Sequence, residues 1–411
     1  MRILQGHVLD MLKTLDAESV HCCVTSPPYW GLRAYGTEPQ NWGNWRGELG
    51  SEPTPEMYVS HMVEIFDEVR RVLRKDGTCW LNISDSYAAN RSYQVKDSKH
   101  VNVGNNGRSS VPDGLKPKDM CLIPQRLVIA LQDAGWWVRS DIVWSKPNPL
   151  PESVRDRPSR SHEYIFLLTK TRRYWYDADA IRRKARIGDL TNPSYRKRGK
   201  SDSRKKHVNI SGIKCAPKNN GFFQAETANA RSVWTFATGS FKDAHFATFP
   251  QELVRRSVLA GCPEKVCRYC GKGWVREVES KAGVSKDCPK TQMSREARGQ
   301  KGATGTVGQS GSGRVDGYRK TLGFSPTCSC NAPHDGNPCH HCGTEGFRAS
   351  VEPCYSPGIV LDPFLGSGTT GLVALQLNRE CIGIELNPEY AEMAEKRIYN
   401  DAPLLNGVEV I

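Results

Sequence analysis

The segment CVTSPPYW, residues 23–30, joins an apolar run to a pair of prolines and a pair of aromatic residues. Because each proline fixes its own φ and lacks a backbone N–H, Pro27 and Pro28 end a strand in a rigid turn. Such a turn can hold the ring of Tyr29 and nearby hydrogen-bond acceptors in fixed positions for a reaction. The alternative is a purely structural turn that packs Tyr29 and Trp30 into the core.

A second candidate segment, LDPFLGSGTT at residues 361–370, follows an apolar run and precedes a helical pattern. Gly366 and Gly368 permit a tight turn and a close approach of the backbone to a ligand, and the following helix N-terminus offers free N–H groups. Glu385 ends the next apolar run, about 20 residues further on, where a carboxylate can accept hydrogen bonds from ribose hydroxyls. Since the GK[ST] ending of a Walker loop is missing, the pattern indicates an adenosine-containing ligand.

The chain has 15 cysteines, and one group between residues 267 and 342 has the short spacings of metal ligands. Without an export signal, zinc explains this group better than disulfides do. Reduced thiols without a metal are the alternative. The predicted ligands of a structural zinc ion are Cys267, Cys270, Cys328 and Cys330, with Cys339 and Cys342 as an alternative second pair.

The 411-residue chain carries a formal net charge of +13 at pH 7, which favours a polyanionic partner such as nucleic acid. Residues 171–240 mix Lys and Arg with Tyr and Trp, a composition that suits contacts with phosphates and stacking on bases. The alternative for this region is an ordinary solvated loop. Its candidate contact residues are Arg172, Arg173, Arg182, Arg183, Lys184, Arg196, Lys197 and Arg198.

The elements that must position these groups alternate between helix and strand. Apolar runs predict strands at residues 19–26, 78–84, 136–146 and 162–170, and helical spacing predicts helices at residues 55–77 and 121–135. Gly77 is the expected C-cap of the first helix. The pattern predicts an α/β fold with a largely parallel sheet. No apolar run of about 18 residues predicts a membrane span, and no signal-peptide pattern is present, so a cytoplasmic protein is expected.

The segments TSPPYW and DPFLGSGTT together resemble the amino-methylating DNA methyltransferases that use S-adenosylmethionine. The catalytic motif precedes the cofactor loop, with a basic region between them, as in the permuted group called the β class. Residues 142–170, 245–261 and 381–390 are also similar to family segments. One departure is Gly6-His7, where the family has Gly-Asp, so a role for that Asp is not carried over.

The resemblance implies a doubly wound, mostly parallel, Rossmann-like sheet that is circularly permuted, with a basic target-recognition region and a cysteine-rich insertion. The implied organisation is a catalytic half at residues 1–170, a target-recognition region at 171–240, a cofactor-binding half at 241–261 and 355–411, and a cysteine-rich, zinc-binding insertion with a flexible stretch at 262–354. The implied partners are double-stranded DNA and a cognate restriction nuclease, in a prokaryotic or phage-encoded system. The oligomeric state is left open.

The resemblance also implies residue roles. The Pro27 carbonyl and the Ser26 hydroxyl accept the two hydrogens of the target amine, so that its lone pair is aimed at the methyl group, and Tyr29 stacks on a base that has left the duplex. The catalytic residues are Ser26, Pro27, Pro28 and Tyr29. The cofactor-binding residues are Asp362, Phe364, Gly366, Ser367, Gly368, Thr369, Thr370 and Glu385, with Phe246 and Thr248 from the flanking segment.

The identity of Ser26 bears on the target base, because adenine enzymes of this family often carry Asp at this position and cytosine enzymes often carry Ser. We expect methylation of the cytosine N4 amine, with the adenine N6 amine as the alternative. Two further alternatives are a catalytically idle, zinc-bearing DNA-binding protein and an RNA or small-molecule methyltransferase.

Overall fold

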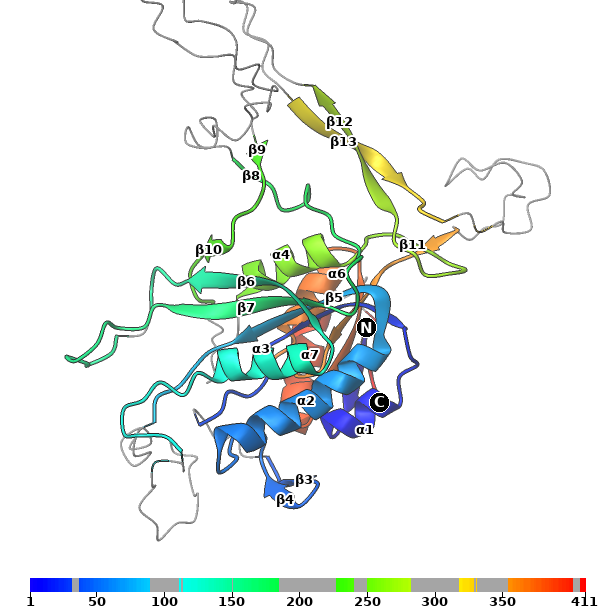
Figure 1. Cartoon of the computed structure of the whole chain (residues 1–411). Helices are drawn as coiled ribbons and strands as arrows, with labels where there is room; N and C mark the ends of the chain where they lie inside the picture. The colour runs from blue at the N-terminus through cyan, green and yellow to red at the C-terminus, as the bar shows by residue number, and fades with distance from the viewer. Residues whose placement is uncertain are drawn as a thin grey trace, which may run out of the picture. The chain divides into compact units, whose positions relative to one another are not determined.

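The computed structural model describes residues 1–31, 37–88, 111, 114–149, 151–184, 227–239, 250–281, 318–328, 330, 354–401 and 407–411. The chain divides into two compact units (Figure 1). The first unit comprises Met1–Ala180, Arg231–Val275 and Ser325–Ile411, and the second comprises Ile181–Ala230 and Arg276–Phe324.

A sheet of nine described strands forms the centre of the first unit, in the order β10-β6-β7-β5-β2-β15-β16-β1-β17. The strands are β1 (Arg2–Gln5), β2 (Val20–Thr25), β5 (Leu73–Ile83), β6 (Trp137–Ser145), β7 (His162–Thr169), β10 (Val233–Thr235), β15 (Ile359–Asp362), β16 (Glu380–Glu385) and β17 (Glu409–Val410). Strand β7 is antiparallel to β5 and β6, and the other neighbours pair in parallel. The prediction of a mostly parallel α/β sheet is confirmed.

Strands from opposite ends of the chain are neighbours in this sheet. Strand β1 lies between β16 and β17, with Arg2 opposite Ile382 and Glu409. Strand β2 pairs with β15, with Cys22 opposite Val360. The strand that precedes the proline turn and the strand that precedes the glycine loop are therefore adjacent, which is the arrangement that a circularly permuted Rossmann-like sheet requires.

Helices cover both faces of the sheet. Helices α1 (Val8–Lys13), α2 (Pro55–Val72) and α3 (Ile123–Asp133) pack together, and α4 (Gln251–Gly261), α6 (Thr369–Gln376) and α7 (Pro388–Asp401) form a second group. Figure 1 shows α2 and α3 on one side of the sheet and α4 and α6 on the other. The sheet is thus doubly wound, as the resemblance implied.

Helix α2 begins with standard capping chemistry but ends earlier than the sequence suggested. The Thr54 hydroxyl accepts a hydrogen bond from the Met57 N–H, and Pro55 occupies the first turn. The predicted end at Gly77 is wrong: Leu73 is extended and starts β5. Gly77 lies within that strand, where a Cβ would come 2.7 Å from Leu73 Cδ1, so close packing explains this glycine.

Smaller elements complete the described chain. The first unit also contains the hairpin of β3 (Gln40–Trp42) and β4 (Trp45–Gly47) and the pair β11 (Val266–Cys267) and β14 (Tyr355–Ser356). The pair β8 (Arg183–Lys184) and β9 (Thr227–Ala228) belongs to the second unit, and β12 (Val275–Lys281) and β13 (Tyr318–Ser325) form a further pair.

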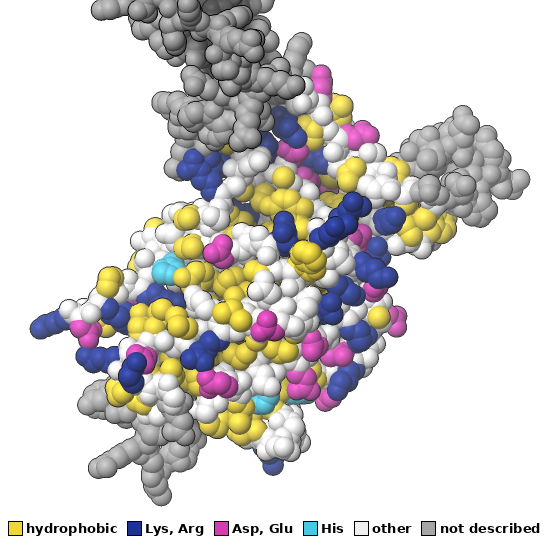
Figure 2. Space-filling model, in the orientation of Figure 1, with side chains coloured by type: hydrophobic (Ala, Val, Ile, Leu, Met, Phe, Trp, Pro, Cys, Tyr) yellow, Lys and Arg dark blue, Asp and Glu magenta, His cyan; other side chains and the backbone are white. Residues whose placement is uncertain are grey.

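Two surface properties bear on the choice of partner. None of the described helices combines the length and the apolar character that crossing a membrane would require. Figure 2 shows Lys and Arg side chains scattered among Asp and Glu side chains over the region of α2 and α3. On this part of the surface the positive charge of the chain is therefore not gathered into a single patch.

Candidate active site

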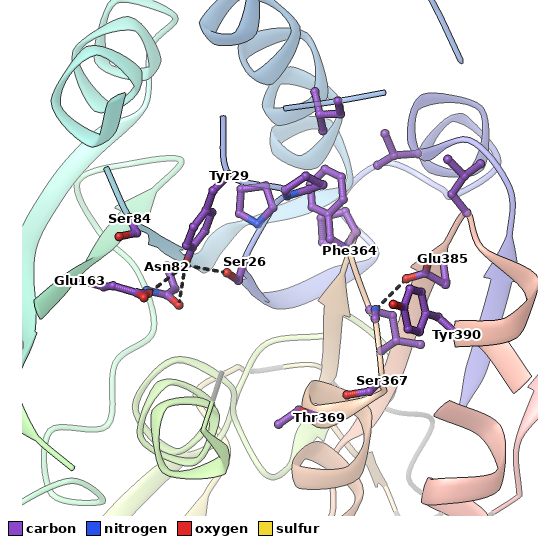
Figure 3. Close-up of a pocket in the computed structure, with 18 of the residues that line it drawn as sticks. Ser26, Tyr29, Asn82, Ser84, Glu163, Phe364, Ser367, Thr369, Glu385 and Tyr390 are labelled. Carbon is purple, nitrogen blue, oxygen red and sulfur yellow. Dashed lines mark hydrogen bonds between the residues drawn. The ribbon is translucent and has the colours of Figure 1, made fainter. Parts of the chain in front are cut away.

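A cavity of about 780 Å³ lies at the carboxyl ends of the central strands. Ser26 to Tyr29 line it after β2, Asn82 lines it from the end of β5, Pro363 to Gly366 after β15, and Glu385 at the end of β16. Open α/β sheets bind ligands at this edge, and the volume is that of a small-molecule or cofactor site. The proline turn and the glycine loop therefore face one another across a single cavity (Figure 3).

The proline turn is anchored from behind by α2 and its preceding loop. The Tyr58 hydroxyl donates to the Pro28 carbonyl at 2.9 Å. Trp30 is buried, and its indole N–H donates to the Glu52 carbonyl at 3.0 Å. Trp30 thus packs into the core, while Tyr29 lines the cavity. The two aromatic residues of the motif have separate environments, which a purely structural turn would not require.

Three polar residues surround the Tyr29 hydroxyl. Ser26 Oγ lies 3.1 Å from it, Asn82 Oδ1 3.2 Å and Glu163 Oε2 2.9 Å (Figure 3). Lys146 donates to the other carboxylate oxygen of Glu163 and lies over the ring of Trp144. The sequence had not pointed to Asn82, Lys146 or Glu163. The available signal was their position, since each lies at or beside the end of a predicted strand.

Asp362 organises the glycine loop from beneath. Its carboxylate is fully buried and accepts hydrogen bonds from Thr25 Oγ1 at 2.7 Å, Thr370 Oγ1 at 2.6 Å and the Phe364 N–H at 3.0 Å. Burial raises the pKa of Asp362 to about 6, because the three donors only partly offset the loss of water around the charged form. The carboxylate ties β2, the loop and α6 together.

Glu385 connects the loop to the end of β16. One carboxylate oxygen accepts from the Gly366 N–H at 2.8 Å and the other from the Asn387 N–H at 2.9 Å. Burial raises the pKa of Glu385, and these two donors oppose that effect. Gly366 has a φ of 54°, a left-handed conformation that favours glycine. The carboxylate is thus fixed at the cavity wall with acceptor capacity remaining.

Arg397 holds the same loop from α7 and was not found from the sequence. Its guanidinium donates to the Ser367 carbonyl, to Ser367 Oγ and to Thr369 Oγ1, at 3.0 to 3.1 Å. Tyr390, also on α7, lines the cavity beside Glu385 (Figure 3). The only sequence signal was the similarity of residues 381–390 to a family segment, which includes Tyr390 but not Arg397.

The predicted site residues separate into three groups by position. Those that line the cavity are Ser26, Pro27, Pro28, Tyr29, Phe364, Gly366, Ser367, Thr369 and Glu385. Asp362, Gly368 and Thr370 lie behind the loop: Thr370 donates to Asp362, and Gly368 packs on Ala394 of α7. Phe246 and Thr248 fall outside the described residues.

Four of the predicted zinc ligands come together in the first unit. The Sγ atoms of Cys267, Cys270, Cys328 and Cys330 all lie within 4.8 Å of one another. The Cys267 N–H donates to the Lys272 carbonyl, and the Gly271 N–H donates to the Cys267 carbonyl, both at 2.8 Å, which forms a tight turn. The alternative pair, Cys339 and Cys342, lies outside the described residues.

The cysteine turn is attached to the amino ends of β2 and β5. His21 Nδ1 accepts from the Ile359 N–H at 3.1 Å, so Nε2 carries the proton and donates to the Gly271 carbonyl at 3.0 Å. Burial lowers the pKa of His21 to about 4, which keeps the ring neutral. Arg74 donates to the Cys270 carbonyl at 3.2 Å. The cysteine cluster is thus joined to the end of β2 opposite the proline turn.

The predicted nucleic-acid contacts are divided between the two units. Arg172 and Arg173 are exposed in the first unit. In the second unit, Arg182 donates to Thr227 Oγ1 at 2.9 Å and to Asn229 Oδ1 at 2.7 Å, which braces the β8–β9 pair. Arg183 and Lys184 form β8. Arg196, Lys197 and Arg198 lie outside the described residues.

The sequence of the chain was compared with family models and with known proteins, and the matches include the proline turn and the glycine loop. A family model described as DNA methylase, of the N6/N4 type, matches residues 20–271 and 348–396. The Type II methyltransferase M.XycI of Xanthomonas campestris pv. cyanopsidis is 36% identical over 398 residues, which are 96% of this chain and 87% of that protein. The Type II methyltransferase M.SmaI of Serratia marcescens is 34% identical over 398 residues, 97% and 90% of the two chains. The proline turn and the glycine loop both fall within the matched residues.

Proposed function

The chain belongs to the family of N6/N4 DNA methylases, and we propose that it transfers a methyl group from S-adenosylmethionine to the exocyclic N4 amine of cytosine in double-stranded DNA. The observation that carries the proposal is the shared cavity. Ser26 to Tyr29, the turn to which we assign the orientation of the amine, line the same cavity as a loop and a carboxylate suited to an adenosine.

The lining of the cavity fits S-adenosylmethionine. Glu385 is held by two backbone donors and keeps acceptor capacity for ribose hydroxyls. Phe364 offers an aromatic ring for the adenine, and Ser367 and Thr369 offer polar groups at the start of α6. When bound, S-adenosylmethionine supplies a methyl group on a positively charged sulfur. The residues of the chain supply orientation.

The proline turn orients the target amine. The amine is a poor nucleophile because its lone pair is delocalised into the base. Hydrogen bonds from its two hydrogens to the Pro27 carbonyl and to Ser26 Oγ favour a pyramidal nitrogen with an available lone pair. The ring of Tyr29 stacks on the base, which leaves the duplex at a cost of a few kcal/mol. Orientation of this kind can contribute roughly 7–11 kcal/mol to lowering a barrier.

The choice of cytosine rests on Ser26, a neutral acceptor where adenine enzymes often carry Asp. Purified protein would be incubated with S-adenosylmethionine and unmethylated mixed-sequence DNA, and the DNA digested to nucleosides for mass analysis. N4-methylcytosine supports the proposal, whereas N6-methyladenine keeps the mechanism and overturns the base assignment. No methylated nucleoside, from protein shown to bind the cofactor, would favour an idle enzyme or a different substrate.

We also propose that Cys267, Cys270, Cys328 and Cys330 bind one structural zinc ion. Four thiolates within 4.8 Å of one another are the donor set of a closed tetrahedral zinc site. Elemental analysis of the purified chain should then find about one zinc per molecule. The variant Cys270→Ser should lose it, and Cys354→Ser, outside the cluster, should retain it. Equal zinc content in both variants would exclude the assignment.

Further partners remain proposals. The relatives are described as Type II methyltransferases, which supports a partner restriction nuclease with the same recognition sequence. The basic residues of 171–240 support a role for that region in target recognition. If they contact phosphates, DNA affinity should fall steeply with added salt, and a flat response would exclude this role.

A further inference from the structure

The hydrogen bonds around Tyr29 form a chain whose direction can be deduced. Glu163 determines this direction, because an ionised carboxylate accepts hydrogen bonds and donates none. Its Oε1 accepts from Lys146, and its Oε2 accepts from the Tyr29 hydroxyl at 2.9 Å and from Asn82 Nδ2 at 3.1 Å. Only 12% of the Glu163 side chain and 19% of the Lys146 side chain are exposed, so water competes weakly with these bonds.

The orientation of the Asn82 amide is fixed by the same logic. Its Nδ2 lies 3.1 Å from Glu163 Oε2 and 3.0 Å from the Tyr164 carbonyl, and both of these atoms only accept. The amide NH₂ must therefore face them, which leaves Oδ1 facing the Tyr29 hydroxyl at 3.2 Å. Asn82 is completely buried, so this orientation is held by the protein alone.

Among the described residues, two acceptors face the single proton of the Tyr29 hydroxyl, Glu163 Oε2 and Asn82 Oδ1. Whichever of them receives the proton, it points away from Ser26. The Tyr29 oxygen is then the acceptor for the Ser26 hydroxyl, 3.1 Å away. Ser26 donates its only proton in this bond, so its oxygen can act as a hydrogen-bond acceptor for a group in the cavity (Figure 3).

We propose that Glu163 is a positioning residue that sets the direction of the chain Ser26 to Tyr29 to Glu163 and thereby presents Ser26 as a hydrogen-bond acceptor to the target amine. This inference rests on the proposed methyl transfer to an exocyclic amine. It holds for cytosine and adenine alike, since each amine has two hydrogens to donate. A serine hydroxyl can otherwise donate or accept, and only acceptance helps the amine nitrogen.

The variant Glu163→Gln breaks the chain between Ser26 and Tyr29 with little change in shape. Lys146 only donates, so it holds the amide oxygen of the new side chain on its own side, and the amide NH₂ faces Tyr29. The Tyr29 oxygen then accepts from Gln at position 163 instead of from Ser26, while the Tyr29 proton stays with Asn82 Oδ1. The Ser26 hydroxyl is then no longer fixed as an acceptor and can turn its proton toward the cavity. We expect kcat to fall about 10- to 100-fold, the range for loss of one charge-assisted hydrogen bond, with KM for cofactor and DNA changed less than about 2-fold.

The decisive test is a double-mutant cycle on single-turnover methylation. Tyr29→Phe keeps the ring but removes the hydroxyl through which Glu163 acts. In the Tyr29→Phe background, Glu163→Gln should therefore cost less than about 2-fold, far from the product of the single losses. Multiplicative losses, or an unchanged kcat in Glu163→Gln, would overturn the proposal. The matched control is Glu68→Gln, the same chemical change on α2 where Glu68 pairs with Arg71, which should be neutral.

Two further measurements separate the possible failures. Methylation by the wild-type chain is measured first, and if it is absent, the proposed function has failed. The positioning role of Glu163 fails only when the wild type is active and the losses of the two single variants multiply in the double variant. If Glu163→Gln does not fold, as judged by thermal unfolding, Ser26→Ala replaces it in the cycle. Both changes then cut the same chain, so Ser26→Ala with Tyr29→Phe should be no slower than Ser26→Ala alone, and a further loss would overturn the proposal.

Discussion

The turn after β2 and the loop after β15 line the same cavity, but different features hold them in place. The turn contains Pro27 and Pro28, whose rings fix the backbone, and a hydrogen bond from Tyr58 to the Pro28 carbonyl anchors it. The loop contains Gly366 and Gly368, which both have positive φ and an intrinsically flexible backbone.

The glycine loop is fixed by charged side chains from other elements. Asp362 holds it from β15, Glu385 from β16 and Arg397 from α7. The proline turn is therefore rigid because of its own residues, whereas the glycine loop is held by residues from several other elements. The difference suits the two proposed tasks, since the amine must be aimed closely while the loop must approach a ligand with its backbone.

The largest effect is expected in the proline turn. Tyr29→Ala removes the stacking ring and the hydroxyl that accepts from Ser26, and kcat should fall on the order of 1000-fold. Cofactor affinity, measured by calorimetry, should be unchanged because Glu385 and the loop are intact. Tyr399→Ala on exposed α7 is the control. Loss of folding in Tyr29→Ala would instead show that the turn is structural.

The second prediction concerns Asp362 and pH. Its pKa is about 6 in the folded chain against 3.8 ordinarily, so the folded state binds more protons between these values and the free energy of unfolding decreases as pH rises through this window. Asp362→Asn lacks this dependence. The stability advantage of the wild type over the variant should shrink by about 2–3 kcal/mol between pH 4 and pH 7.

Urea unfolding of both proteins at several pH values measures this change. Asp133→Asn, at the exposed end of α3, serves as the control and should run parallel to the wild type. Parallel curves for Asp362→Asn as well would mean that the buried carboxylate is not the group that links the loop to pH.

A smaller effect is expected from Arg397→Met, which removes the hydrogen bonds to Ser367 and Thr369 but keeps most of the side-chain volume. The dissociation constant of S-adenosylmethionine should rise about 10-fold, with kcat at saturation near that of the wild type. Lys396→Met is the neighbouring control, because Lys396 pairs with Glu392 on the surface of α7. A lower kcat with unchanged affinity would break the division of tasks between the two loops.

The smallest effect is expected from Gly366→Ala. No atom lies within 4 Å of the position of the new Cβ, so only the left-handed backbone is penalised, by about 1 kcal/mol. Cofactor affinity should fall about 5-fold. Gly43→Ala, at a φ of 59° and also in open space, carries the same strain in the β3–β4 hairpin. It should lower stability similarly without changing cofactor affinity.

The parts of the molecule that local patterns determine were predictable. Apolar runs gave β2 and β5, the motif glycines and Glu385 gave the loop and its acidic neighbour, and the C-x-x-C spacing led to a cluster that the structure brings together. The predicted helix end at Gly77 was wrong because a glycine can mark either a helix end or a close contact. Only the packing of Leu73 against Gly77 distinguishes the two.

The polar interactions between distant strands were not predictable. Asn82, Lys146 and Glu163 meet only because β5, β6 and β7 are adjacent in the sheet. Asp362 was expected at the cofactor site, but burial turns its carboxylate toward Thr25 and Thr370. A single sequence gives the residue types of such networks but not the direction in which each side chain points.

The position of β1 between β16 and β17 has a consequence for how the chain folds as it is made. Arg2 leaves the ribosome long before its partner Ile382 is synthesised. Pairings between such distant residues are slow to form, and an unpaired strand edge invites aggregation in the meantime. Glu385, which lies beside Gln5 of β1, forms part of the cavity wall. This part of the wall can therefore assemble only after β16 has left the ribosome.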